Sequence, residues 1–102
     1  MTASPIRSAL VQDPDFAEIV SAFVEEVPKR VESIRNTFAE QDRKRLCTLV
    51  HQLRGACGSY GFHELTPLAT TLEFSLRSTV PLEQLLPQVE EFLEACLRMT
   101  DE

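Results

Sequence analysis

The chain of 102 residues lacks several features that mark common classes of protein. It has only three cysteines, widely spaced and without a C-x-x-C pair, so neither a disulfide framework nor a zinc site is expected. No apolar run approaches the roughly 20 residues of a membrane span, and the first residues lack a basic-then-apolar signal segment. There is also no strand pattern, low-complexity tract or internal repeat. These absences favour a protein of a reducing cytoplasm with no membrane partner.

Positive charge is also in short supply. Ten lysines and arginines face sixteen aspartates and glutamates, which gives a net charge of −6 at pH 7. A nucleic-acid partner would require a basic face, so the charge balance argues against one.

The chain is long enough for one hydrophobic core and too short for two. We therefore expect residues 1–12 to form a mobile N-terminal lead, apart from a few apolar side chains that could dock, and residues 13–102 to form a single monomeric domain.

Glycine is scarce, and its placement is informative. The chain has three glycines, Gly55, Gly58 and Gly61, all within ten residues of His51. Around them the apolar residues recur at helical spacing on one face. That face consists of Leu46, Leu49, Val50, Leu53, Cys57 and Tyr60. At about 100° per residue, His51 points almost directly away from it, on an exposed strip with Lys44, Arg54, Gly55 and Gly58.

The two glycines inside this helix reduce its stability. Each costs about 1 kcal/mol relative to alanine, in a domain whose total stability is about 5–15 kcal/mol. With no Cβ one turn beyond His51, a partner backbone or a phosphate can approach the imidazole without a clash. Alternatively, Gly55 could let a neighbouring helix pack closely, but it lies opposite the apolar stripe. We therefore interpret the glycines as providing access to His51.

Capping residues and prolines predict the helix boundaries. Asp13 is placed to cap a helix that has Pro14 at its first position. Pro28 is predicted to end this helix or to open the next one, because the residue before a proline is pushed away from helical geometry. The second helix is expected to close near residues 40–41. Asp42 would then cap the His51 helix, and Gly61 would end it.

Two further helical segments follow. One is expected over residues 63–77, with Pro67 in its first turn, and the last opens at Pro81, where Pro87 should kink it or split off a short first turn. Short connections between amphipathic helices favour an antiparallel arrangement. The predicted fold is all-α: an antiparallel up-down four-helix bundle from the helices after Pro28, with an additional N-terminal helix covering one end.

The sequence around the histidine resembles a known family. The run His51-Gln52-Leu53-Arg54-Gly55, with Gly61 six residues later and a leucine-rich helix ending at Leu72-Glu73, resembles the histidine-containing phosphotransfer (HPt) domain. The resemblance covers nearly the whole chain. The family more often has lysine at the position of Arg54; both are cations, but arginine presents a planar fork in place of a point charge.

The resemblance implies a function. His51 would be the phosphoacceptor, through its outer ring nitrogen (Nε2), of a two-component phosphorelay, in a phosphocarrier without kinase activity of its own. The partner would be the receiver domain of a response regulator or hybrid sensor kinase, and it would supply the acceptor aspartate and Mg²⁺. This chain has no carboxylate cage around His51 and no nucleotide-binding loop, so no cofactor of its own is expected.

Individual residues fit this chemistry. A neutral imidazole is a good nucleophile near pH 7, and Arg54, one turn on, can offer charge-assisted hydrogen bonds to phosphoryl oxygens. Lys44 could add longer-range attraction. The docking surface implied by the resemblance is the exposed part of the His51 helix, where Gly55 and Gly58 leave room. Gln52 and Ser59 are additional candidates for partner contact.

Other interpretations stay open. The chain could be a helical interaction module with no covalent chemistry, a metal- or haem-binding bundle, or the substrate domain of a chemotaxis-type kinase whose catalytic part is a separate chain.

His63 serves as an internal comparison, because it has no cation one turn on and is expected to be a cap or surface residue. Phe62 is expected in the core. Cys47, one turn before His51, is a candidate reactive thiol.

Overall fold

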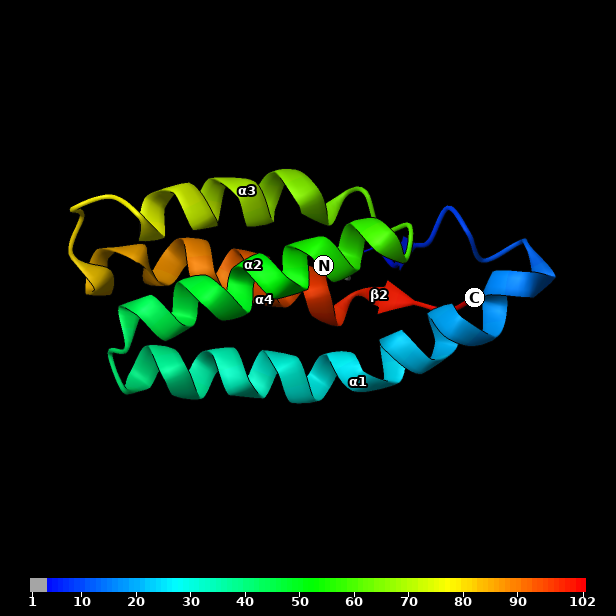
Figure 1. Ribbon diagram of the computed structural model, residues 1–102, viewed down its shortest axis with the longest axis horizontal. Helices are drawn as coiled ribbons and strands as arrows, with labels where there is room; N and C mark the ends of the chain where they lie inside the picture. The colour runs from blue at the N-terminus through cyan, green and yellow to red at the C-terminus, as the bar shows by residue number, and fades with distance from the viewer. Residues whose placement is uncertain (1–3) are drawn as a thin grey trace.

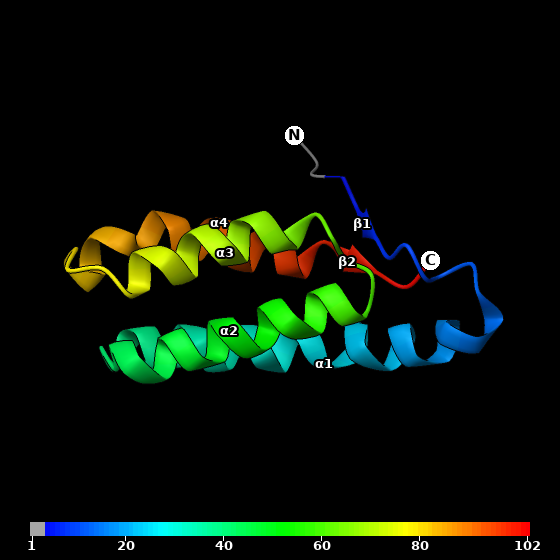
Figure 2. The same cartoon turned by 45° about the horizontal axis from the view of Figure 1, so that its top comes forward.

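The computed structural model describes residues 4–102 as a bundle of helices (Figure 1). Four α-helices run antiparallel, each beside the next, and a second view shows the same layering (Figure 2). The elements in chain order are β1 Ile6–Arg7, α1 Pro14–Ala39, α2 Arg43–Ser59, α3 Leu65–Leu76, the 3₁₀-helix η1 Leu82–Leu85, α4 Leu86–Leu97 and β2 Met99–Thr100. The predicted all-α four-helix bundle is confirmed.

The predicted break at Pro28 is wrong. Asp13 caps α1 as expected, its side chain accepting a hydrogen bond from the Asp15 N–H, but the helix then runs for 26 residues through Pro28. The expected N-terminal covering helix is thus the first half of α1. An interior proline costs about 3 kcal/mol, and the apolar stripe continues across it, with Val27 and Val31 both buried. Since burying each such side chain contributes about 1.5–3 kcal/mol, the stripe on both sides outweighs the lost hydrogen bond.

The boundaries of α2 are as predicted. The Asp42 side chain accepts a hydrogen bond from the backbone N–H of Arg45 and caps the first turn. At the other end Gly61 has a φ of +84°, a left-handed conformation that glycine adopts at little cost. The Arg43 guanidinium donates to the carbonyl oxygens of Leu76 and Ser78, among others, and so joins the start of α2 to the end of α3.

The first described residues pack against the far end of α2. Ile6 is buried, and β1 pairs in parallel with β2, with Ile6 opposite Met99. The buried Ser8 hydroxyl donates to the Tyr60 carbonyl, and the Ala9 N–H donates to the Gly61 carbonyl at 2.9 Å. The part of the expected lead at residues 1–3 lies outside the described residues. The strand pair was not predicted, since two-residue strands show no periodicity.

In the second half of the chain, prolines lie at the starts of the helices. Pro67 lies in the first turn of α3, and η1 separates from α4 just before Pro87, so the predicted splitting of a short first segment is confirmed. The core runs the length of the bundle and includes fully buried Phe62 and Phe92. Within residues 4–102 the helices are either too short or too polar to cross a membrane.

Replacing Gly61 with alanine is expected to lower the free energy of unfolding by about 1–3 kcal/mol, the cost of holding a residue with a side chain in a left-handed conformation. The new Cβ would also lie 2.6 Å from the Ser8 hydroxyl and 3.0 Å from the Ala9 nitrogen. Urea denaturation followed by circular dichroism measures the change.

Gly58→Ala is the matched control for this prediction. A Cβ at Gly58 would have nothing within 4 Å, and the residue lies inside α2. Alanine there should therefore raise the stability by about 1 kcal/mol. If the two variants changed stability in the same direction, the left-handed turn would not be what requires Gly61.

Candidate functional site

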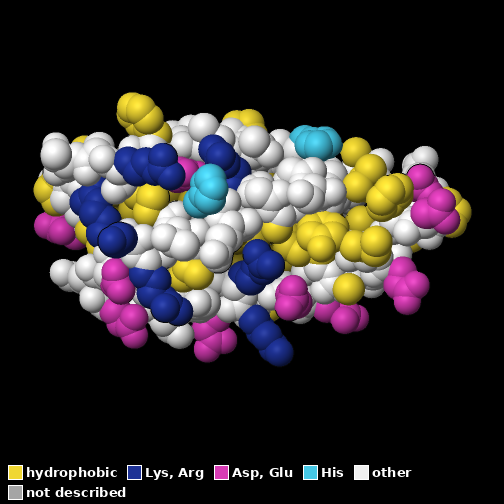
Figure 3. Space-filling model, viewed as in Figure 1, with side chains coloured by type: hydrophobic (Ala, Val, Ile, Leu, Met, Phe, Trp, Pro, Cys, Tyr) yellow, Lys and Arg dark blue, Asp and Glu magenta, His cyan; other side chains and the backbone are white. Residues whose placement is uncertain are grey.

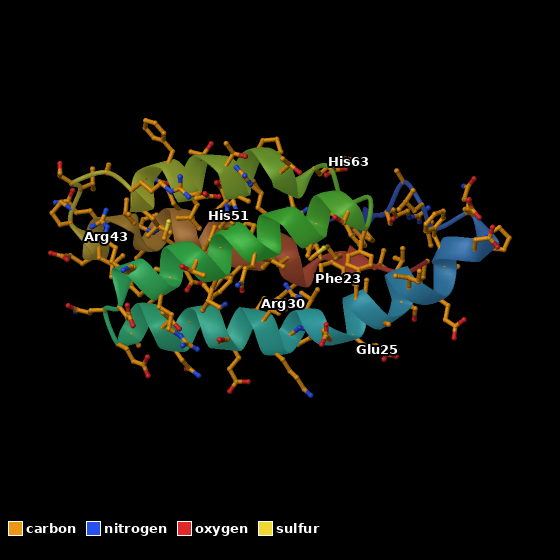
Figure 4. The ribbon with its side chains drawn as sticks, in the orientation of Figure 1. Phe23, Glu25, Arg30, Arg43, His51 and His63 are labelled. Carbon is orange, nitrogen blue, oxygen red and sulfur yellow. The ribbon has the colours of Figure 1, made fainter. Side chains whose placement is uncertain are left out.

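His51 lies on the outside of the bundle, midway along α2, on the side that faces α3 (Figure 4). Its side chain is 54% exposed, while Val50 and Leu53 beside it in the sequence are buried. The helical wheel therefore predicted its orientation correctly. The ring is open to solvent but not free to rotate, because one of its nitrogens has a partner.

That partner is Glu73 of α3. The Nδ1 atom of His51 lies 3.0 Å from Oε2 of Glu73, whose side chain is only 6% exposed. An ionised carboxylate can only accept hydrogen bonds, so the proton of a neutral ring sits on Nδ1. Nε2 is then the nitrogen with the free lone pair. The contact thus selects one tautomer and anchors the ring.

Two arginines also approach the Glu73 carboxylate. Nη2 of Arg77 lies 2.7 Å from Oε2, the same oxygen that His51 contacts. Nε of Arg54 lies 3.6 Å from Oε1, which is too long for a hydrogen bond, and Oε1 is buried without a hydrogen-bond partner. We call His51, Arg54, Glu73 and Arg77 the His51 cluster. It joins α2 to α3 through one buried carboxylate.

Glu73 and Arg77 were not among the site residues expected from the sequence. A usable signal was present for Glu73, since it lies four residues after Ala69 and three before Leu76, on the apolar face of α3 that packs inward. Charged side chains at such positions are nearly always paired. Arg77 follows Glu73 at the i+4 spacing of helical ion pairs.

The two helical glycines leave open space beside the ring. A Cβ added at Gly55 or at Gly58 would have nothing within 4 Å. The alternative explanation for Gly55, close packing by a neighbouring helix, therefore finds no neighbour among the described residues. A partner's surface could approach α2 closely at these positions.

The helix that carries His51 is electropositive although the protein is acidic. The 17 residues of α2 include Arg43, Lys44, Arg45 and Arg54 but no aspartate or glutamate. With Arg77 close by, lysine and arginine side chains gather over one half of the face that shows His51 (Figure 3). Lys44 is exposed, and within residues 4–102 no hydrogen bond or ion pair joins its side chain to the His51 cluster. Such a face attracts anionic groups.

A groove lies between α1 and α2. Its volume is about 360 Å³, and Gln52, the residue next to His51, forms part of its wall. The other lining residues are Arg30, Ser33, Ile34, Leu49, Leu53 and Ala56. We call it the α1–α2 groove. Gln52 and Ser59 are both exposed, and only Gln52 lines this groove.

The remaining candidates lie apart from this chemistry. His63 is exposed near the start of α3, and no side-chain hydrogen bond is formed by its ring within residues 4–102, as expected of a surface residue. Across the same residues, no group of three or more histidine, cysteine, aspartate or glutamate side chains converges as metal ligands. Cys57 and Cys96 are buried, whereas Cys47 is only partly buried.

Comparisons with known proteins identify the family to which this chain is similar. A family model described as the Hpt domain matches residues 18–101. The chain is also similar to the signal transduction histidine-protein kinase BarA of Shigella flexneri, with 31% identity over 80 residues. The matched region is 78% of this chain but 8% of that kinase, so the chain corresponds to a small part of its relative. No solved structure gives a significant match.

The thiols are expected to differ sharply in reactivity. Burial raises the pKa of Cys57 to about 12 and also raises the pKa of Cys96, so neither forms the reactive thiolate near pH 8. Cys47 is only partly buried. Iodoacetamide should therefore modify only Cys47 in the folded protein and all three thiols in urea, as counted by mass spectrometry. Equal labelling of the three in the native state would contradict this assignment.

Proposed function

The chain belongs to the Hpt domain family, and we propose that it passes a phosphoryl group between His51 and the aspartate of a receiver domain. Its general role is histidine phosphotransfer in a two-component phosphorelay. The observation that supports the specific proposal is the geometry of His51, which is exposed on α2 and anchored through Nδ1 to the buried Glu73 carboxylate. This arrangement leaves Nε2 directed away from its anchor with a lone pair.

The proposed step is an in-line displacement at phosphorus. The Nε2 lone pair forms the new N–P bond while the bond between phosphorus and the aspartyl carboxylate oxygen breaks, and the carboxylate leaves with the bonding electrons. The ring becomes cationic and keeps its proton on Nδ1, where Glu73 accepts it and stabilises the positive charge. The reverse step returns the phosphoryl group to an aspartate.

Nearby cations would stabilise the transferring group. Negative charge spreads over the equatorial phosphoryl oxygens during transfer, and Arg54 lies one turn from His51 with its side chain 35% exposed. Because its Nε is beyond hydrogen-bonding distance of Glu73, its fork can turn to a phosphoryl oxygen. Lys44 would add longer-range attraction. The aspartate and Mg²⁺ belong to the receiver in this proposal, and this chain is a carrier without kinase activity.

The surface around His51 supports docking of a receiver. Gly55 and Gly58 leave space for the rim of a partner's active site, and the α1–α2 groove provides apolar area next to Gln52. The electropositive α2 complements a site built from carboxylates and a phosphoryl group. A helical interaction module without covalent chemistry would use the same surface, so labelling must separate the two functions.

Incubation with a receiver domain that carries radiolabelled aspartyl phosphate should move the label to this chain. The label should be stable in base and labile in acid, as expected of a phosphohistidine. His51→Gln should abolish it, and His63→Gln, which removes the other histidine, should leave it unchanged. A folded protein that takes no label from any receiver of its own genome would instead be an interaction module.

Filling the space at Gly55 tests the access argument. Gly55→Gln should slow transfer by at least about tenfold, equivalent to about 1.4 kcal/mol of the barrier, because the new side chain obstructs the approach to Nε2. The same change should raise the stability of the fold by nearly 1 kcal/mol. Gly55→Ala, which adds only a Cβ, is the matched control and should slow transfer less. An undiminished rate in Gly55→Gln would show that this space is not used.

A further inference from the structure

We propose that Arg77 is a positioning residue that keeps Glu73 ionised and thereby holds His51 in the tautomer with its proton on Nδ1. The effect on the ring does not require phosphotransfer. The effect on the transfer rate rests on the proposed function, because the lone pair on Nε2 is the nucleophile in that reaction.

The geometry connects Arg77 to the ring through a single oxygen atom. Arg77 follows the last residue of α3, one turn after Glu73, and its Nη2 lies 2.7 Å from Oε2. The same oxygen lies 3.0 Å from Nδ1 of His51. Among residues 4–102, no hydrogen bond or ion pair joins Arg77 directly to His51. Arg77 therefore acts on the ring only through the carboxylate.

Glu73 requires this cation because it is buried. Its side chain is 6% exposed, and a charge taken out of water is stable in a protein only beside a compensating charge. Arg54 is a weaker partner, at 3.6 Å from Oε1, and Oε1 has no hydrogen bond. Within the described residues, Arg77 has the only guanidinium at hydrogen-bonding distance from the carboxylate.

Arg77 is well suited to supply a permanent charge. The neighbouring Cys47 thiol and the Glu73 carboxylate raise its pKa above its already high usual value. Its side chain is 65% exposed, so the guanidinium remains partly hydrated while it contacts Oε2. Solvent weakens an ion pair of this kind, but the 2.7 Å contact keeps the guanidinium charge next to the buried oxygen. The guanidinium therefore stays protonated near neutral pH.

Because Arg54 is too distant to form a hydrogen bond to Glu73, loss of the Arg77 charge would favour two other states, and both place a proton on Nε2. In the first, Glu73 takes up a proton and its hydroxyl donates to Nδ1, so the proton of the neutral ring moves to Nε2. In the second, His51 becomes an imidazolium that balances the carboxylate, with protons on both nitrogens. Either state removes the lone pair of the proposed nucleophile. The positive charge of Arg77 disfavours both.

The direct test is the tautomer of His51 in Arg77→Met, which keeps an apolar stem of similar length but lacks the charge. Ring ¹⁵N chemical shifts distinguish the protonation state of each nitrogen. The intact protein should show His51 with its proton on Nδ1, and Arg77→Met should move the population toward protonated Nε2. The exposed His63 is an internal reference that should not change. A wild-type tautomer in Arg77→Met would overturn the proposal.

Two control variants separate charge from structure. Arg77→Lys keeps a cation at the site and should largely restore the wild-type tautomer. Arg45→Met removes an exposed cation from the first turn of α2 and should leave the ring unchanged. If Arg77→Met does not fold, the background Glu73→Gln provides the second test, because a neutral amide needs no neutralising charge. In that background, replacing Arg77 should have little effect on the ring.

Transfer kinetics complete the test. Label transfer from a phosphorylated receiver should slow about tenfold in Arg77→Met, about 1.4 kcal/mol in the barrier, and recover in Arg77→Lys. Slower transfer with an unchanged tautomer would mean that Arg77 contacts the phosphoryl group or the partner, which would overturn the positioning role. The two proposals can also fail separately. If the wild-type protein accepts no label but Arg77→Met still changes the tautomer of His51, the proposed function is refuted and the positioning role of Arg77 is supported.

Discussion

The interaction on which the site depends is the contact of the buried Glu73 carboxylate with His51 and Arg77. A carboxylate this far from water is stable in its ionised form only when cations and hydrogen-bond donors surround it. Here His51 and Arg54 approach it from α2, and Arg77 approaches it from the end of α3. The contact of Glu73 with His51 joins α2 to α3 and orients the imidazole. The contacts of His51 and Arg54 with this carboxylate cross from α2 to α3, whereas the contact of Arg77 lies at the end of α3.

The rest of α2 is organised around exposure of this ring. Its inward face is apolar and fully buried, which fixes the rotation of the helix and directs His51 outward. Its outward face combines cations with two glycines that have no neighbour, although glycine lowers helix stability. Neither feature improves the fold. Both become understandable if an anionic surface of another protein must come close to Nε2, as the proposed phosphotransfer requires.

The bundle supplies a rigid support for this helix. The α1 helix continues through Pro28 and lies along the whole length of α2 (Figure 1), and the Arg43 side chain joins the start of α2 to the end of α3. At the other end of α2, the left-handed conformation of Gly61 lets the chain turn. Ser8 and Ala9 donate hydrogen bonds to the carbonyl oxygens of Tyr60 and Gly61 and so close that end of the bundle. The site thus sits in the middle of a helix that is held at both termini, so the position of the ring follows from the packing of the whole domain.

The sequence by itself determined the features that depend on near neighbours in the chain. Helical periodicity predicted the bundle and the outward direction of His51, and the caps at Asp13 and Asp42 and the turn at Gly61 marked the helix ends, because each depends on a few consecutive residues. The pairing of His51 with Glu73 could not be predicted, since it joins residues 22 positions apart and depends on how two helices pack. The continuity of α1 through Pro28 and the pairing of β1 with β2 were likewise decided by tertiary structure. In α1, burial of apolar side chains on both sides of Pro28 outweighs the local cost of an interior proline. The strands β1 and β2 lie near opposite ends of the chain, so they can pair only after the helices have packed.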